Sequence, residues 1–158
     1  MRILGLNPSS KHSKNVARDL LLGCWCKGKR IAGVQFPPLP LIYTATALKD
    51  VGCDVDVLDA QAESKKLEDI ILIISDYDIV FLISATMSYA EDVSILEELK
   101  KANPNLITII FGAHPTFLPE QALKSKSVDI IVRNESEFCI RDLILALEKE
   151  DGSWKAER

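Results

Sequence analysis

Polar side chains gather in three short segments, each directly after an apolar run. The segments are residues 84–88, 112–115 and 133–137, and the apolar runs before them are 79–83, 106–111 and 128–132. Their hydroxyl, imidazole, guanidinium and carboxylate groups can all hydrogen-bond a ligand. In open parallel sheets, ligands bind at the carboxyl ends of the strands. The spacing therefore predicts a binding site formed by turns at one edge of a sheet.

The apolar runs predict the sheet that positions these turns. Runs that are continuously apolar are typical of parallel strands covered by helices on both faces. Two further strands are expected at 2–6 and 53–58, the second near a sheet edge because its residues alternate. Helices are expected at 39–51, 67–75, 89–102, 120–125 and 137–148. The pattern predicts an α/β, flavodoxin-like (Rossmann-like) doubly wound sheet of five parallel strands in a three-layer α/β/α arrangement.

The helix at 89–102 has the clearest signals. Ser88 is expected to cap its first turn, with Glu91 three residues later completing a capping box. One apolar stripe follows along the helix, and Asn103-Pro104 is expected to end it. The stripe consists of Val93, Leu96 and Leu99.

The chain of 158 residues, 47% hydrophobic and 27% charged, fits one globular domain. We expect the domain to span 1–148, followed by a linker or tail at 149–158. About 30 residues, 7–38, separate the first strand from the first long helix, and a connection of that length is usually functional or partly disordered. A short helix at 16–22 is expected within it.

Charge and hydropathy exclude several partners. The net charge of −4 argues against nucleic acid, whose phosphates need a basic face. No apolar run approaches the roughly 18 residues of a membrane span, so a cytoplasmic protein without a membrane partner is expected. The four cysteines, at 24, 26, 53 and 139, are expected to be reduced. A zinc site at Cys24 and Cys26 lacks a second ligand pair, because Cys53 and Cys139 are expected in or beside the core.

Other enzyme classes lack their motifs. The sequence has no GxGxxG after a strand, no Walker A motif and no Gly-x-Ser-x-Gly elbow. A response-regulator receiver needs an acidic pair after the first strand and an Asp after the third, where Asn7-Pro8 and Ser84-Ala85-Thr86 stand instead.

Four motifs follow one another along the chain: Pro37-Pro38-Leu39 with Leu41, Tyr43 and Ala45; Gly52, Val55, Val57 and Asp59; Gly112-Ala113-His114-Pro115-Thr116 before Pro119-Glu120; and Val128-Asp129 before Arg133-Asn134-Glu135-Ser136-Glu137. Together they resemble the N-terminal cobalamin (B12)-binding domain of B12-dependent radical SAM proteins. Family members commonly show Gly-Gly-x-His and Arg-Gly-Glu-x-Glu, where this chain has Phe111-Gly112-Ala113-His114 and Arg133-Asn134-Glu135-Ser136-Glu137, so one glycine of each motif is replaced.

The resemblance implies a corrinoid site at the strand ends. In the family, Gly112 would let the backbone come close to the ligand. Simpler roles stay open: Ser88 as a helix cap, Thr86 as a turn residue, and Glu135 and Glu137 as capping charges. The cofactor-binding residues implied are Pro37, Pro38, Leu39, Ser84, Thr86, Met87, Ser88, Gly112, Ala113, His114, Pro115, Arg133, Asn134 and Glu135.

No protein histidine is expected on the cobalt. Cobalamin proteins that ligate cobalt use Asp-x-His-x-x-Gly after the first strand, but His12 has neither the Asp nor the Gly at those spacings. A lone His in a turn, such as His114, is more often a hydrogen-bonded structural group than a metal ligand. The resemblance therefore implies base-off cobalamin without a histidine below the metal.

The sequence also lacks CxxxCxxC, the motif that holds the radical SAM cluster. S-adenosylmethionine and a 4Fe-4S cluster would thus belong to a radical SAM barrel absent from this chain, either in a longer chain or in a partner. The chain is then a non-catalytic, cofactor-binding portion of an enzyme, with methyl transfer as the expected chemistry. The alternative is an interaction module that has lost the corrinoid and uses its basic 27–30 loop and strand-end cleft for a partner.

Overall fold

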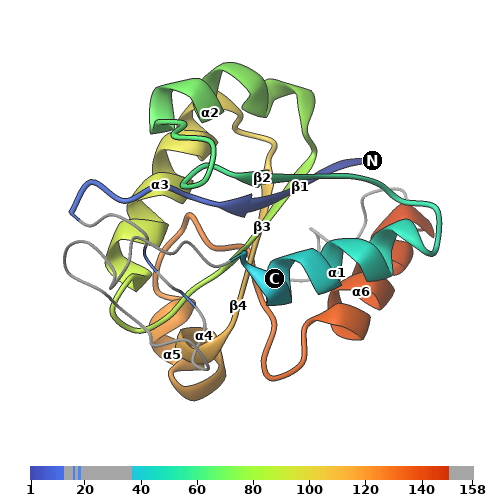
Figure 1. The fold of residues 1–158 in the computed structure, drawn as a ribbon. Helices are drawn as coiled ribbons and strands as arrows, with labels where there is room; N and C mark the ends of the chain where they lie inside the picture. The colour runs from blue at the N-terminus through green and yellow to red at the C-terminus, as the bar shows by residue number, and fades with distance from the viewer. Residues whose placement is uncertain (13–15, 17, 19–36, 150–158) are drawn as a thin grey trace.

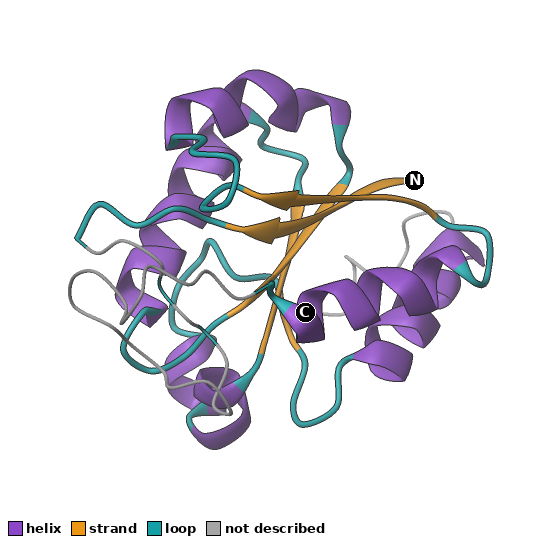
Figure 2. Cartoon of the chain, viewed as in Figure 1, coloured by secondary structure: helices purple, strands orange, loops and turns teal. Residues whose placement is uncertain are grey.

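The computed structural model describes residues 1–12, 16, 18 and 37–149. Helices and strands alternate along it (Figures 1 and 2). The strands are β1 (Arg2–Asn7), β2 (Asp54–Asp59), β3 (Ile79–Ile83), β4 (Ile107–Phe111) and β5 (Ile130–Ile131). The helices are α1 (Leu39–Lys49), α2 (Leu67–Ile73), α3 (Tyr89–Ala102), α4 (Ala113–Phe117), α5 (Pro119–Ala122) and α6 (Glu137–Lys149), with a 3-10 turn at Ile74–Asp76.

The five strands form one sheet in the order β2-β1-β3-β4-β5, and every pair is parallel. The expected flavodoxin-like fold is confirmed. The strand order reverses direction between β1 and β3, and at such a point the two following connections leave toward opposite faces. This switch point is the place on the sheet edge where a ligand site is expected.

Helices cover both faces of the sheet (Figure 1). Alternate residues of one strand enter different cores: Ile3 packs with α1 and α6, whereas Leu4 packs with α2 and α3. Strands β3 and β4 are buried along their whole length. Burial on both faces explains why their sequences are continuously apolar.

Several boundaries differ from those expected. The turn expected at 112–116 is mostly the short helix α4, and the helix expected at 120–125 is α5. The last strand shortens from 128–132 to Ile130–Ile131. Here the Thr108 amide donates to the Asp129 carboxylate at 2.9 Å instead of to a backbone carbonyl, so a side chain takes the place of one rung of the ladder.

Three expectations fall on residues outside the described ranges: the helix at 16–22, the Cys24-Trp25-Cys26 segment and the basic 27–30 loop. The domain limits at 148 and the tail at 149–158 stay predictions. The expectation that Cys139 lies in or beside the core is wrong, because Cys139 is exposed while Cys53 is buried. On α6 the buried positions are Ile140, Ile144 and Leu147, a spacing that turns Cys139 away from the core.

Candidate functional site

The turn after β3 is held by a buried carboxylate. Ser84 and Ser88 are 0% and 2% exposed, and each hydroxyl donates a 2.7 Å hydrogen bond to Oδ2 of Asp92. The expected capping box is wrong, since Ser88 makes no side-chain cap of α3. The carboxylate of Glu91 instead accepts bonds from the Ser10 hydroxyl and the Lys11 amide, both at 2.6 Å. Both serine hydroxyls are therefore used inside the chain.

Arg18 completes this buried network. Its Nε donates to Oδ1 of Asp92 at 2.8 Å, and its Nη1 donates to Oδ1 of Asn7 at 3.3 Å and to the carbonyl of Pro8 at 3.0 Å. Burial raises the pKa of the Asp92 carboxyl, while the Arg18 guanidinium and the two serine hydroxyls oppose that rise. The Arg18–Asp92 ion pair thus joins the ends of β1 and β3 to the first turn of α3. Through Arg18, it also ties in the connection between β1 and α1.

Thr86 and Met87 are the exposed members of the same turn. The Met87 side chain is 58% exposed, and Thr86 is exposed beside it. The Thr86 hydroxyl lies 3.4 Å from Nδ1 of His114, which ties the turn after β3 to the turn after β4. A ligand over the sheet edge would meet these two side chains, while the two serines lie beneath them.

His114 is enclosed in the first turn of α4. It is 1% exposed and stacks on the ring of Tyr89, with centroids 3.8 Å apart and an interplanar angle of 18°. Burial lowers the pKa of its imidazole, and the Asp92 carboxylate opposes this shift. Its Nε2 has no hydrogen-bond partner in the described part of the chain. Because buried polar atoms are normally paired, this nitrogen calls for a partner from outside the described residues.

Gly112 serves the packing of β4 on β3. Its φ is +105°, and a Cβ at this position would lie 2.9 Å from the Ser84 carbonyl oxygen and 2.8 Å from an Ile83 carbon. The amide of Ser84 donates to the Phe111 carbonyl at 2.8 Å on the same strand pair. In the structure, the close approach that glycine permits is therefore to the neighbouring strand.

The two positions where the family commonly has glycine have separate explanations. Phe111 stands at the first glycine of Gly-Gly-x-His, where it ends β4, is 2% exposed and has no positive φ, while Ala113 at the variable position begins α4. Asn134 adopts φ +62°, a left-handed conformation that asparagine tolerates better than most residues. Its amide donates to the Thr116 hydroxyl at 3.0 Å, and Nε of Arg133 donates to the Thr116 carbonyl at 3.2 Å. The turn after β5 is thus fastened to the end of α4.

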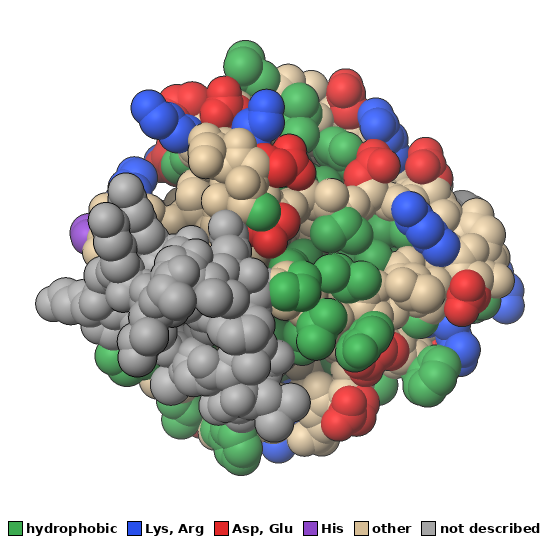
Figure 3. All heavy atoms as spheres, in the orientation of Figure 1, with side chains coloured by type: hydrophobic (Ala, Val, Ile, Leu, Met, Phe, Trp, Pro, Cys, Tyr) green, Lys and Arg blue, Asp and Glu red, His purple; other side chains and the backbone are tan. Residues whose placement is uncertain are grey.

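The remaining candidates lie at the start of α1, in α4 and in the turn after β5. Pro37 and Leu39 are exposed and Pro38 is half-buried, immediately before and at the first turn of α1. Glu135 is exposed, Pro115 is buried, and the neighbouring Ser136 hydroxyl lies 2.8 Å from the Thr44 hydroxyl. Figure 3 shows hydrophobic side chains gathered on this face of the molecule, close to α1. Exposed apolar residues of α1 and α6 include Leu39, Tyr43 and Phe138.

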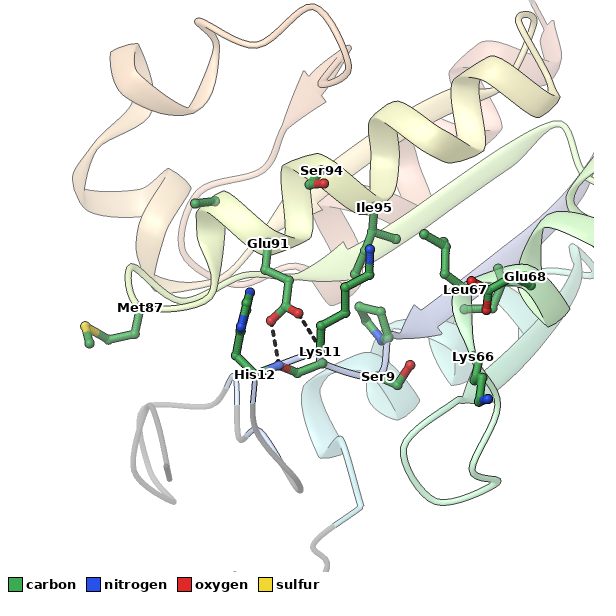
Figure 4. Close-up of a pocket in the computed structure, with 14 residues that line it drawn as sticks. Ser9, Lys11, His12, Lys66, Leu67, Glu68, Met87, Glu91, Ser94 and Ile95 are labelled. Atoms are coloured by element: carbon green, nitrogen blue, oxygen red, sulfur yellow. Dashed lines mark hydrogen bonds between the residues drawn. The ribbon is translucent and has the colours of Figure 1, made fainter. Parts of the chain in front are cut away.

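A pocket of about 830 Å³ opens at the same edge of the sheet, on the side covered by α2 and α3 (Figure 4). It is lined by residues that follow β1, by the start of α2 and by the start of α3. These three segments lie at the carboxyl ends of β1, β2 and β3. Met87 belongs both to the pocket wall and to the exposed turn after β3.

The sequence interpretation missed Asp92, Arg18 and Tyr89. For Asp92 a signal was present, because it occupies the buried face of α3 together with Leu96 and Leu99, at positions four and seven residues before them. An acid among apolar residues at helical spacing indicates a buried carboxylate with a partner. No pattern in the sequence identifies Arg18 as that partner, since it lies 74 positions away.

Comparison with protein families matches residues 30–144 to the B12 binding domain. Among curated proteins, the chain is 33% identical over 77% of its length to an uncharacterised methyltransferase of Pyrococcus horikoshii. It is 31% and 32% identical, over 82% and 83% of its length, to anaerobic magnesium-protoporphyrin IX monomethyl ester cyclases of Synechocystis sp. and Rubrivivax gelatinosus. It spans 27%, 27% and 24% of these relatives, about a quarter of each.

An all-parallel five-stranded sheet with ligand-sized space at its carboxyl edge defines a binding domain of the flavodoxin-like class. The chain belongs to the B12-binding domain family, as the motifs predicted. Within the described residues, no helix has the length and apolar character needed to cross a membrane.

Proposed function

We propose that this chain holds a corrinoid over the carboxyl ends of β1, β3 and β4, as the cofactor-binding portion of a longer enzyme. One observation carries the proposal: the turns after β3 and β4 meet at one edge, where Thr86 and Met87 are exposed beside a pocket and Nε2 of His114 has no partner among the described residues. A corrin is a flat apolar ring bordered by amides, so it needs an apolar surface with a few hydrogen-bonding groups. The edge offers both.

The residues divide into those that would touch the ligand and those that hold them. We assign contact to the exposed candidates, and support to the buried and half-buried ones. The contact set is Pro37, Leu39, Thr86, Met87, Arg133, Asn134 and Glu135. The supporting set is Pro38, Ser84, Ser88, Gly112, Ala113 and Pro115, with His114 supporting the turn and offering Nε2 to an amide of the ligand.

We further propose that the corrinoid is bound base-off and without a histidine on cobalt. His114 is enclosed against Tyr89, which hinders it from reaching a metal above the sheet edge. His12 lines the pocket on the α2 and α3 side of the sheet, next to Glu91 (Figure 4). A bound corrinoid would supply a cobalt that carries a methyl group, and this chain would orient the ring and exclude water from its lower face.

The longer enzyme would contribute the rest of the chemistry. The chain spans only about a quarter of its relatives, one of which is named a methyltransferase. We propose that S-adenosylmethionine and a 4Fe-4S cluster bind on a radical SAM barrel in the same longer chain or in a partner, that the reaction is methyl transfer, and that the protein acts in the cytoplasm.

The alternative is a module that kept the fold and lost the corrinoid. The internal use of the Ser84 and Ser88 hydroxyls, and the packing of Gly112 against β3, favour it because these residues would serve the fold without a ligand. In that case the exposed apolar side chains near α1 would serve a protein partner.

The test is a titration with hydroxocobalamin and methylcobalamin, followed by desalting and an absorption spectrum. We expect retained corrin absorbance without the signature of a lower nitrogen ligand. Thr86→Trp should reduce retention of the corrinoid. Leu72→Trp should not, because Leu72 is 79% exposed on the outer side of α2. Retention only by a longer chain carrying CxxxCxxC would mean a site shared between domains. Absence of binding in both would favour the interaction module.

A further inference from the structure

The side pocket between the β1 loop, α2 and α3 has an apolar floor. Ile70 and Ile95 form it and are 1% and 6% exposed, and Pro8 and Leu67 also line it. Because these two isoleucines are almost fully covered, the apolar surface open to a ligand comes mainly from half-buried Leu67 and from Met87, which is 58% exposed. Covering that surface is favourable, so the pocket fits the apolar body of a ligand.

Charges of both signs surround that floor. Lys11 and Lys66 contribute two positive charges, and Glu68 and Glu91 contribute two negative ones, which leaves no net charge on the rim. Glu91 is anchored by the Ser10 hydroxyl and the Lys11 amide. The hydroxyls of Ser9 and Ser94 complete the polar lining. The rim thus presents donors and acceptors together, without the excess of positive charge that a phosphate or carboxylate would need.

The pocket adjoins the proposed ligand surface. Met87 lies at one end of the pocket (Figure 4) and is also exposed in the turn after β3. The loop after β1 forms the wall that faces α3 (Figure 4), and it is fixed to α3 by the two bonds to Glu91. A broad ring lying over Thr86 and Met87 would consequently extend one side into the pocket.

We propose that this pocket is a subsite for the edge of the corrin ring that carries neutral amide arms. The inference rests on the proposed corrinoid function and adds a second surface to it, formed by α2 and the outer side of α3. Amides donate and accept hydrogen bonds and carry no charge, which matches a rim of mixed donors and acceptors with no net charge. The phosphate-bearing nucleotide tail would lie elsewhere.

The experiment fills the pocket without touching the turns. Ser94 is exposed, so Ser94→Trp should fold normally while its indole occupies the pocket. Lys101→Trp, seven residues further on the same face of α3 and also exposed, is the matched control. Dissociation constants would be measured for hydroxocobalamin and for dicyanocobinamide, which keeps the amide-bearing ring but lacks the nucleotide tail, and thermal unfolding would verify each fold.

We expect Ser94→Trp to weaken both ligands by about tenfold, the loss expected for one buried apolar contact, and Lys101→Trp to weaken neither. Unchanged binding of both ligands by Ser94→Trp would overturn the subsite while leaving the corrinoid function intact. Weakened cobalamin with unchanged cobinamide would also overturn it, because the pocket would then hold the tail. Absence of binding by the unmodified chain would overturn both proposals.

Discussion

Arg18 and Asp92 form an ion pair at 2.8 Å in which each side chain is 1% exposed. Removing two charges from water is costly, and the cost is offset only when the remaining donors and acceptors are satisfied. Here the carboxylate accepts from Ser84 and Ser88, and the guanidinium also donates to Asn7 and Pro8. The pair therefore fixes the relative positions of the β1 and β3 ends.

Breaking this pair should destabilise the fold strongly. Asp92→Asn leaves a buried guanidinium without its counter-charge, and we expect it to lower the free energy of unfolding by about 3–5 kcal/mol. The double variant Arg18→Met/Asp92→Leu should recover most of that loss, because it removes both charges. Urea unfolding of the three proteins measures both effects. An Asp92→Asn protein as stable as the parent would show that the pair contributes nothing.

Gly112→Ala should destabilise the chain more than Gly52→Ala. Both glycines have positive φ, but an added Cβ would meet the Ser84 carbonyl oxygen at position 112 and open space at position 52. Backbone strain alone costs about 1–2 kcal/mol, and we expect the clash at 112 to add a similar amount. Thermal unfolding of both variants gives the comparison. Equal losses would mean that β3 yields to the new methyl group.

Asn134→Gly should leave stability within about 0.5 kcal/mol of the parent, whereas Asn134→Val should lower it by about 1–2 kcal/mol. Asn134 lies at φ +62°, which glycine adopts freely and a β-branched residue resists. The hydrogen bond to Thr116 comes from the backbone amide, so both variants keep its donor. Denaturant unfolding tests this, and a stable valine variant would contradict the assigned conformation.

The free energy of unfolding should decrease as the pH is lowered, because of His114. Burial lowers the pKa of its imidazole in the folded state, so the unfolded chain binds the proton more readily. The stabilisation from neutral His114 is fully present above the pKa of the unfolded chain, about 6.5. It is lost as pH falls from there toward the pKa in the folded chain, and it amounts to about 1.4 kcal/mol per unit of difference between the two pKa values. His114→Phe should reduce the change in the free energy of unfolding between pH 7 and 5. His12→Gln, at an exposed position, is the control and should keep the slope.

The central strands were predictable from the sequence because burial on both faces leaves an apolar run in each of them. Their order was predictable because each crossover between parallel strands must be right-handed. The end of α1 was less predictable: the helix stops at Lys49, and Gly52 turns the chain toward β2. The turn at 112–116 was misread because α4 has five residues, too few for an apolar stripe to show. Short helices are set by tertiary contacts such as the stacking of His114 on Tyr89.

The candidate site was predictable in location and less so in the direction of its side chains. Strand ends of a parallel sheet meet at one edge, so the three polar segments had to converge. Whether a serine hydroxyl faces outward depends on a partner elsewhere in the chain, and Asp92 takes both Ser84 and Ser88. The side pocket depends on three segments distant in sequence, which no local pattern connects.

Both edges of the sheet discourage pairing with the strands of another molecule. At one edge, β5 has two residues and offers almost no ladder to extend. At the other, β2 carries acidic side chains at Asp54, Asp56 and Asp59, so an identical edge would meet like charges. With both edges blocked in this way, contacts with other protein surfaces are left to the helices and the strand-end turns.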